Sequence, residues 1–131
     1  MSLVPIKSKV RKKCSTCARY SPARNILAVT CAKDKVLNLH AIDLPDNSVA
    51  TVLSFDTLEH VEDPRLAMQE IHRVLQPGGV VVITSVMDFP IHEFPYDYCR
   101  FKPEVFKSIL KPFQSSFVGW QGKELFPHAA V

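Results

Sequence analysis

The run Val80-Val81-Val82-Ile83-Thr84 constrains the fold of this chain more than any other segment. Consecutive β-branched residues predict a strand that is covered on both faces, as in a parallel sheet. A helix is predicted from Pro64 to Leu75, because Asp63 offers an N-cap acceptor and proline suits the first helical position. Pro77-Gly78-Gly79 should end that helix and turn the chain. Together with a central strand at Val49–Phe55, this order predicts a right-handed βαβ unit.

Shorter apolar runs predict further elements around this unit. Ile26–Val29 and Val36–Leu39 are each typical of a short buried strand. Phe117–Trp120 is predicted as another strand. A second helix is predicted over Pro103–Leu110, and its apolar side chains should face inward: Val105, Phe106, Ile109 and Leu110.

The charge distribution divides the chain near residue 25. The 131 residues carry a net charge of +3, and every acidic residue follows Lys33. We therefore expect residues 1–24 to form a basic leader, in part without fixed structure, and residues 25–131 to form the domain. Tyr20 is the only aromatic residue among these basic residues, which disfavours a nucleic-acid-binding surface. Charged residues precede any apolar segment, and no run is long enough to span a bilayer, so we expect a cytoplasmic protein without membrane contact.

Cys14 and Cys17 form a C-x-x-C pair, a spacing found in zinc and redox sites. A structural zinc site needs four ligands, and no second pair follows at a regular spacing. We therefore predict no metal ligand in this chain. A small zinc or nucleic-acid module built on this pair and the basic leader remains an alternative.

Several ordered blocks resemble one known family of enzymes. They lie between Asn38 and Phe113, at consistent separations: Leu44–Val49, Leu58–Pro64, Glu70–Gly79 and Pro90–Glu104. In this combination they resemble the S-adenosylmethionine (SAM)-dependent methyltransferases often called type 11. The resemblance implies an α/β fold with a Rossmann-like methyltransferase sheet, incomplete at its N-terminal side, and SAM as the cofactor at the carboxyl ends of the strands.

The resemblance also implies roles for individual residues. His60 would act as a base or orient the methyl acceptor, whose identity the sequence does not give. Cofactor contacts are expected from residues near the strand ends: Asn38, His40, Ser54, Phe55 and Asp56. Acceptor contacts are expected from Tyr96, Asp97 and Arg100, although the last two could instead form an ion pair that holds their loop. Methyl transfer is a direct displacement, so alignment of the reactants supplies much of the rate.

One departure from the family weighs against activity. The family's glycine-rich loop lets the backbone approach the cofactor, and no glycine precedes Gly78 in this chain. The sequence therefore leaves two readings open within the family. The chain is either a SAM-dependent methyltransferase or a non-catalytic module of the same fold. Such a module would expose a sheet edge and could pair there with another copy or another protein.

Overall fold

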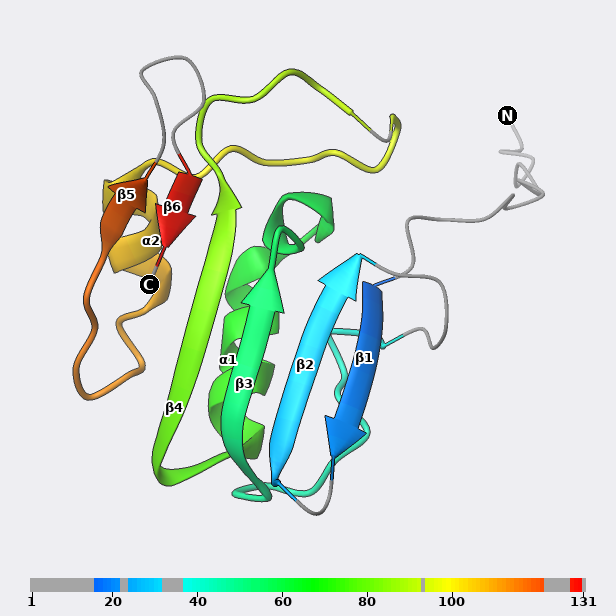
Figure 1. Cartoon of the computed structure of the whole chain (residues 1–131), viewed down its shortest axis with the longest axis vertical. Coiled ribbons are helices and arrows are strands. Elements are labelled where there is room, and N and C mark those ends of the chain that lie inside the picture. Colours follow the sequence, from blue (N-terminus) through cyan, green and yellow to red (C-terminus); the bar gives the residue numbers. More distant parts are fainter. Residues whose placement is uncertain (1–15, 22–23, 32–36, 93, 122–127, 131) are drawn as a thin grey trace, which may run out of the picture.

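The computed structural model describes residues 16–21, 24–31, 37–92, 94–121 and 128–130, which form a mixed α/β layer structure (Figure 1). The described strands make one sheet in the order β1-β2-β3-β4-β6-β5. Their bounds are β1 (Thr16–Ser21), β2 (Ile26–Cys31), β3 (Val49–Phe55), β4 (Leu75–Val86), β5 (Gly119–Gln121) and β6 (His128–Ala130). The helices are η1 (Leu58–His60), α1 (Pro64–Val74) and α2 (Pro103–Ile109).

The three central strands β2, β3 and β4 are parallel. β1 pairs antiparallel with β2, and β6 runs antiparallel to both of its neighbours. The carboxyl ends of the parallel strands, at Cys31, Phe55 and Val86, therefore share one edge of the sheet, where their arrowheads lie in Figure 1. We call this the carboxyl edge. It receives the loops that follow β3 and β4, and these loops hold most of the predicted site.

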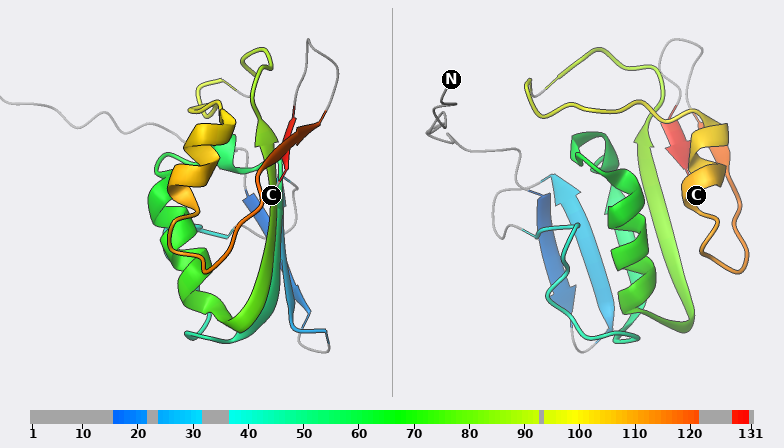
Figure 2. Two further views of the ribbon diagram at one scale, coloured as in Figure 1. Left: turned by 90° about the vertical axis from the view of Figure 1, so that its left-hand side faces the viewer. Right: turned by 180° about the vertical axis from the view of Figure 1, so that it is seen from behind.

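Both helices α1 and α2 cover the same face of the sheet (Figure 2). α1 begins where the sequence predicts, because the Asp63 side chain accepts hydrogen bonds from the backbone of Arg65 and Leu66. Its apolar stripe is buried in the main core: Ala67, Met68, Ile71 and Val74. The predicted strand at Val49–Phe55, the helix and the strand through Val80–Thr84 are all confirmed, and they form the expected βαβ unit.

The turn between α1 and β4 differs in detail from the prediction. The helix ends at Val74, and Leu75 already pairs with Val49 of β3. Residues 76–79 loop out of the ladder before pairing resumes at Val80. Gly78 has a left-handed backbone with φ +75°, which favours glycine. A Cβ on Gly79 would come within 2.9 Å of the Ala50 carbonyl oxygen, so the second glycine is required by close packing.

Three local predictions are wrong. The described part of Val36–Leu39 forms a turn and loop, while Val36 lies outside the described residues; Leu39 is buried because its side chain joins the core from that turn. Val105 is 43% exposed, since the inward face of α2 carries Phe106 and Ile109. Phe117 is 80% exposed and precedes the strand, which begins only at Gly119.

The basic leader contains a strand that the sequence analysis missed. Thr16–Ser21 forms β1 and pairs along its whole length with β2, although residues 1–15 lie outside the described part. An edge strand is held mainly by backbone hydrogen bonds, so it needs no apolar pattern that a sequence would reveal. None of the helices in the described residues combines the length and apolar character needed to cross a membrane.

Candidate functional site

Asp56 is the first residue after β3 and has a strained backbone at the carboxyl edge. Its φ is +45°, a left-handed conformation that costs a non-glycine residue about 1 kcal/mol. Thr84 of β4 fixes it there. The Thr84 carbonyl accepts from the Asp56 amide at 3.0 Å, and the Thr84 hydroxyl donates to Asp56 Oδ1 at 3.1 Å. The carboxylate itself is exposed, so it faces outward from the end of the central strand.

His60 lies at the end of η1 with a half-buried ring. Its Nδ1 donates to the backbone carbonyl of Tyr96 at 2.8 Å. A carbonyl can only accept, so the proton must be on Nδ1, and Nε2 of the neutral ring carries a lone pair. The ring meets that of His92 edge-on, with the centroids 4.8 Å apart. His60 thus presents one basic nitrogen beside a second imidazole.

The loop of residues 87–102, between β4 and α2, is held by an ion pair. Arg100 contacts both carboxylate oxygens of Asp97, with Nη2 donating to Oδ2 at 2.7 Å. Arg100 also donates to the carbonyls of Phe89 and Pro90. The Asp97 side chain is 0% exposed, and the Arg100 guanidinium lowers the pKa of its carboxyl to about 2. These contacts favour the loop-holding alternative for the pair.

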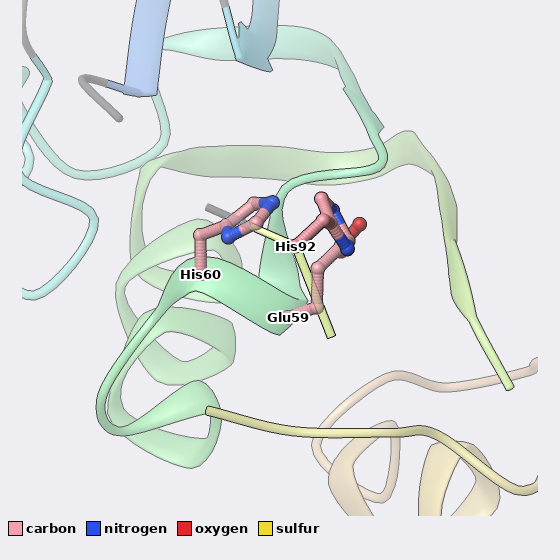
Figure 3. A group of neighbouring side chains, drawn as sticks. All are labelled: Glu59, His60 and His92. Carbon is pink, nitrogen blue, oxygen red and sulfur yellow. The ribbon is translucent and has the colours of Figure 1, made fainter. Parts of the chain in front are cut away.

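Glu59 is a functional candidate that the sequence analysis did not select. Its side chain is completely buried, and Oε2 accepts from the Ser85 hydroxyl at 2.6 Å. Its backbone carbonyl accepts from Tyr98 and Cys99, which fastens the 87–102 loop to η1. Glu59, His60 and His92 lie together (Figure 3), and one possible ligand atom from each lies within 4.8 Å of the others. An acidic residue inside the apolar turn Leu58–Val61 was the signal available in the sequence.

The residues predicted to contact the cofactor do not gather at one point. Asn38 Oδ1 accepts from the His40 amide, which closes a turn. His40 Nε2 accepts from the Asp63 amide at 3.1 Å, at the start of α1. The Ser54 hydroxyl is buried and has no hydrogen-bond partner among the described residues, whereas Phe55 is 40% exposed beside Asp56. The structure therefore brings His60, Tyr96, Asp97 and Arg100 together through the 87–102 loop, and leaves Asn38 and His40 near the first turn of α1. The roles predicted for these residues stay predictions.

The structure adds little information on the pair Cys14 and Cys17. Cys14 lies outside the described residues, and Cys17 lies in β1. Cys99, in the 87–102 loop, is a half-buried thiol, and burial raises its pKa.

Comparison with known proteins identifies the family. The profile of the methyltransferase domain family matches residues 6–83, more than half of the chain. The chain therefore belongs to this methyltransferase domain family. A probable S-adenosylmethionine-dependent methyltransferase of Mycolicibacterium smegmatis is 42% identical over 48 residues, which cover 37% of this chain and 19% of that protein. The demethylmenaquinone methyltransferase of Geobacillus stearothermophilus is 31% identical over 101 residues, covering 67% of this chain and 43% of that protein. The chain thus spans less than half of the length of either relative.

Solved structures confirm the fold. A SAM-dependent methyltransferase of Thermotoga maritima, described as a possible histamine N-methyltransferase, superposes with a TM-score of 0.58 at 18% identity, covering 73% of this chain and 61% of that one. The trans-methyltransferase CalH in complex with S-adenosylhomocysteine gives 0.60 at 13% identity, covering 73% of this chain and 33% of that one. The predicted Rossmann-like methyltransferase sheet is therefore confirmed over the part that these structures share.

Proposed function

We propose that this chain takes part in SAM-dependent methyl transfer and that its carboxyl edge faces the reacting groups. Membership of the methyltransferase domain family supports this proposal, as do the relatives named as SAM-dependent enzymes. The observation that carries it is Asp56, an exposed carboxylate on a strained backbone at the end of the central parallel strand. In open α/β sheets ligands bind at this edge, and backbone strain concentrates at functional sites.

The described residues fit one end of SAM rather than its whole length. The Asp56 carboxylate retains lone pairs that can accept from an ammonium or hydroxyl group, and the exposed Phe55 ring adds apolar surface beside it. No glycine occurs in residues 1–77, so every described residue between β2 and β3 carries a Cβ that limits close backbone approach to a ligand. We therefore propose cofactor contact centred on the end of β3.

The 87–102 loop is proposed to face the methyl acceptor. When bound, SAM supplies an activated methyl group, so the residues of this chain need chiefly to align the acceptor. The Asp97–Arg100 pair fixes the loop, and its backbone holds the His60 ring through the Tyr96 carbonyl. The chain would then provide a rigid surface that faces the methyl acceptor.

The comparisons do not favour the zinc module or the non-catalytic module. Pairing with another protein at an outer strand, β1 or β5, stays a proposal, and light scattering at several concentrations would test it.

Calorimetric titration with S-adenosylhomocysteine, the demethylated cofactor product, tests the proposed function. We expect the chain to bind it with a Kd below about 1 mM. Asp56→Asn should weaken binding about tenfold, because it removes a charge-assisted acceptor while asparagine tolerates the same left-handed backbone. Asp43→Asn changes an exposed carboxylate in the loop before β3 and serves as the matched control. A folded chain that gives no heat, or an Asp56→Asn variant that binds like the parent chain, would contradict the proposal.

A further inference from the structure

We propose that Glu59, His60 and His92 form a binding site for one divalent transition-metal ion of the zinc type. Glu59 and His60 come from η1 after β3, and His92 comes from the 87–102 loop after β4 (Figure 3). The site therefore joins the two segments that leave the carboxyl edge side by side. The proposal rests on these three side chains and does not depend on cofactor binding.

Within the described part of the chain, the carboxylate of Glu59 is hydrogen-bonded through only one of its two oxygens. One oxygen accepts from the Ser85 hydroxyl, while Oε1 is buried and has no hydrogen-bond partner among the described residues. Leaving a carboxylate oxygen unpaired in the interior costs several kcal/mol. A metal cation bound at Oε1 would satisfy it. The group is also held rigidly, because the Glu59 backbone anchors the 87–102 loop through Tyr98 and Cys99.

Both histidines are oriented through their Nδ1 atoms. His60 donates its Nδ1 proton to the Tyr96 carbonyl at 2.8 Å. His92 Nδ1 lies 3.2 Å from the Pro90 carbonyl and 3.2 Å from Asp97 Oδ2, both of which can only accept. Each neutral ring must then keep its proton on Nδ1 and offer the Nε2 lone pair. A carbonyl or carboxylate behind each imidazole is the arrangement that orients metal-binding histidines and strengthens them as ligands.

The possible ligand atoms of these residues lie close to one another. One ligand atom from each of the three residues lies within 4.8 Å of the others. Bonds of about 2.0–2.2 Å to zinc would bring such atoms to roughly 3.3 Å apart in a tetrahedral site. The ligand atoms would therefore have to come about 1.5 Å closer together when the ion binds. A small rotation of the His92 side chain, which is 33% exposed, can supply this movement while the loop backbone stays in place.

The ligand types select the class of ion. Two imidazole nitrogens and one carboxylate suit zinc and neighbouring first-row ions, whereas magnesium and calcium prefer oxygen ligands throughout. Three protein ligands leave at least one coordination position open. A metal on His60 Nε2 would occupy the lone pair that a general base needs, so this proposal assigns His60 to metal binding in place of the predicted base role.

Cobalt(II) titration followed by visible absorption provides the test, because its spectrum reports the ligand set. The parent for all measurements carries Cys14→Ser and Cys17→Ser, which removes the cysteine pair as a competing site. We expect one cobalt ion per chain, displaced by zinc, with no thiolate-to-cobalt band. His92→Gln and Glu59→Gln should each weaken binding at least about tenfold. His72→Gln, an exposed histidine on α1, should leave it unchanged.

Three results would overturn the site: no cobalt binding by the folded parent, a thiolate band, or His92→Gln binding like the parent. His92 is the decisive position because its partly exposed loop tolerates change, and circular dichroism verifies that each variant is folded. Titration of the same proteins with S-adenosylhomocysteine separates the two proposals. Retained cofactor-product binding without cobalt binding would remove the metal site alone.

Discussion

The connection before β3 and the loops after β3 and β4 use their polar side chains differently. In the connection of residues 37–48, between β2 and β3, polar groups are committed to holding the chain. Arg73 of α1 donates to the carbonyls of Ile42 and Leu44 there, and Asn38 closes a turn. Around η1 and the 87–102 loop, Asp97 and Arg100 also hold the chain, but Glu59 Oε1 has no hydrogen-bond partner among the described residues and the Asp56 carboxylate is exposed. Committed groups indicate a structural role, and available groups placed on a rigid frame indicate chemistry.

The same contrast bears on the proposed function. These groups follow β3 and β4 at the carboxyl edge, where we propose that the cofactor and the methyl acceptor bind. The connection before β3 has no glycine and is tied to α1 through Arg73 and Glu70. We therefore expect the residues after β3 and β4, and not the connection before β3, to contact the reacting groups.

Phe106→Ala should have the largest effect on the acceptor-facing side. Phe106 of α2 is fully buried and packs against Phe101, which ends the 87–102 loop, at a ring distance of 5.1 Å. We expect a loss of about 3–5 kcal/mol in the free energy of unfolding, measured by urea denaturation. Val105→Ala, at the exposed neighbouring position, should change it by less than about 0.5 kcal/mol. Equal effects would mean that α2 does not belong to the core.

Asp97→Asn should have the next largest effect. It removes the charge opposite Arg100 and weakens the two-point contact between Arg100 and residue 97 that holds the loop. We therefore expect a loss of about 2 kcal/mol in the free energy of unfolding. Asp88→Asn alters an exposed carboxylate in the same loop and serves as the control. Unchanged stability in Asp97→Asn would show that the pair does not organise this side of the edge.

Because of the Asp97 carboxylate, we also expect the folded chain to lose stability at acidic pH. Its pKa is about 2 in the folded chain against an ordinary value of 3.8, because Arg100 stabilises the charged form. The stabilisation is complete above about pH 5 and is lost as the pH falls through 3.8 toward 2, a change of about 2 kcal/mol. Urea midpoints between pH 5 and 2 measure it. In Asp97→Asn the urea midpoint should fall less steeply with decreasing pH. An identical fall would mean that other carboxyl groups cause the loss of stability.

Asn38→Ala should have the smallest effect, and it tests the connection between β2 and β3. Asn38 makes one exposed hydrogen bond to the His40 amide. We expect a loss of less than about 1 kcal/mol and little change in binding of S-adenosylhomocysteine. A tenfold loss of binding with preserved stability would return this residue to the cofactor site that the family resemblance implies.

Sequence reasoning captured the elements whose pattern is local and missed the contacts that join distant segments. The Asp63-Pro64 cap and the β-branched run at Val80–Thr84 fixed α1 and the centre of β4, because capping and strand propensity act between neighbours. β1 was missed because backbone pairing carries no side-chain pattern. The grouping of Glu59 with His92, which are 33 residues apart, depends on how the loops fold back over the edge. The Asp97–Arg100 pair was anticipated because its members are three residues apart.

The most direct measurement of the central claim is a two-dimensional amide NMR titration with S-adenosylhomocysteine. We expect the largest shifts at the carboxyl edge, at Phe55, Asp56 and Thr84, with smaller shifts in η1. Residues 76–79, at the opposite end of β4, provide an internal reference that should not move. Shifts confined to β1 or to α2, or a folded chain whose spectrum does not change, would contradict the assignment of the carboxyl edge as the site of methyl transfer.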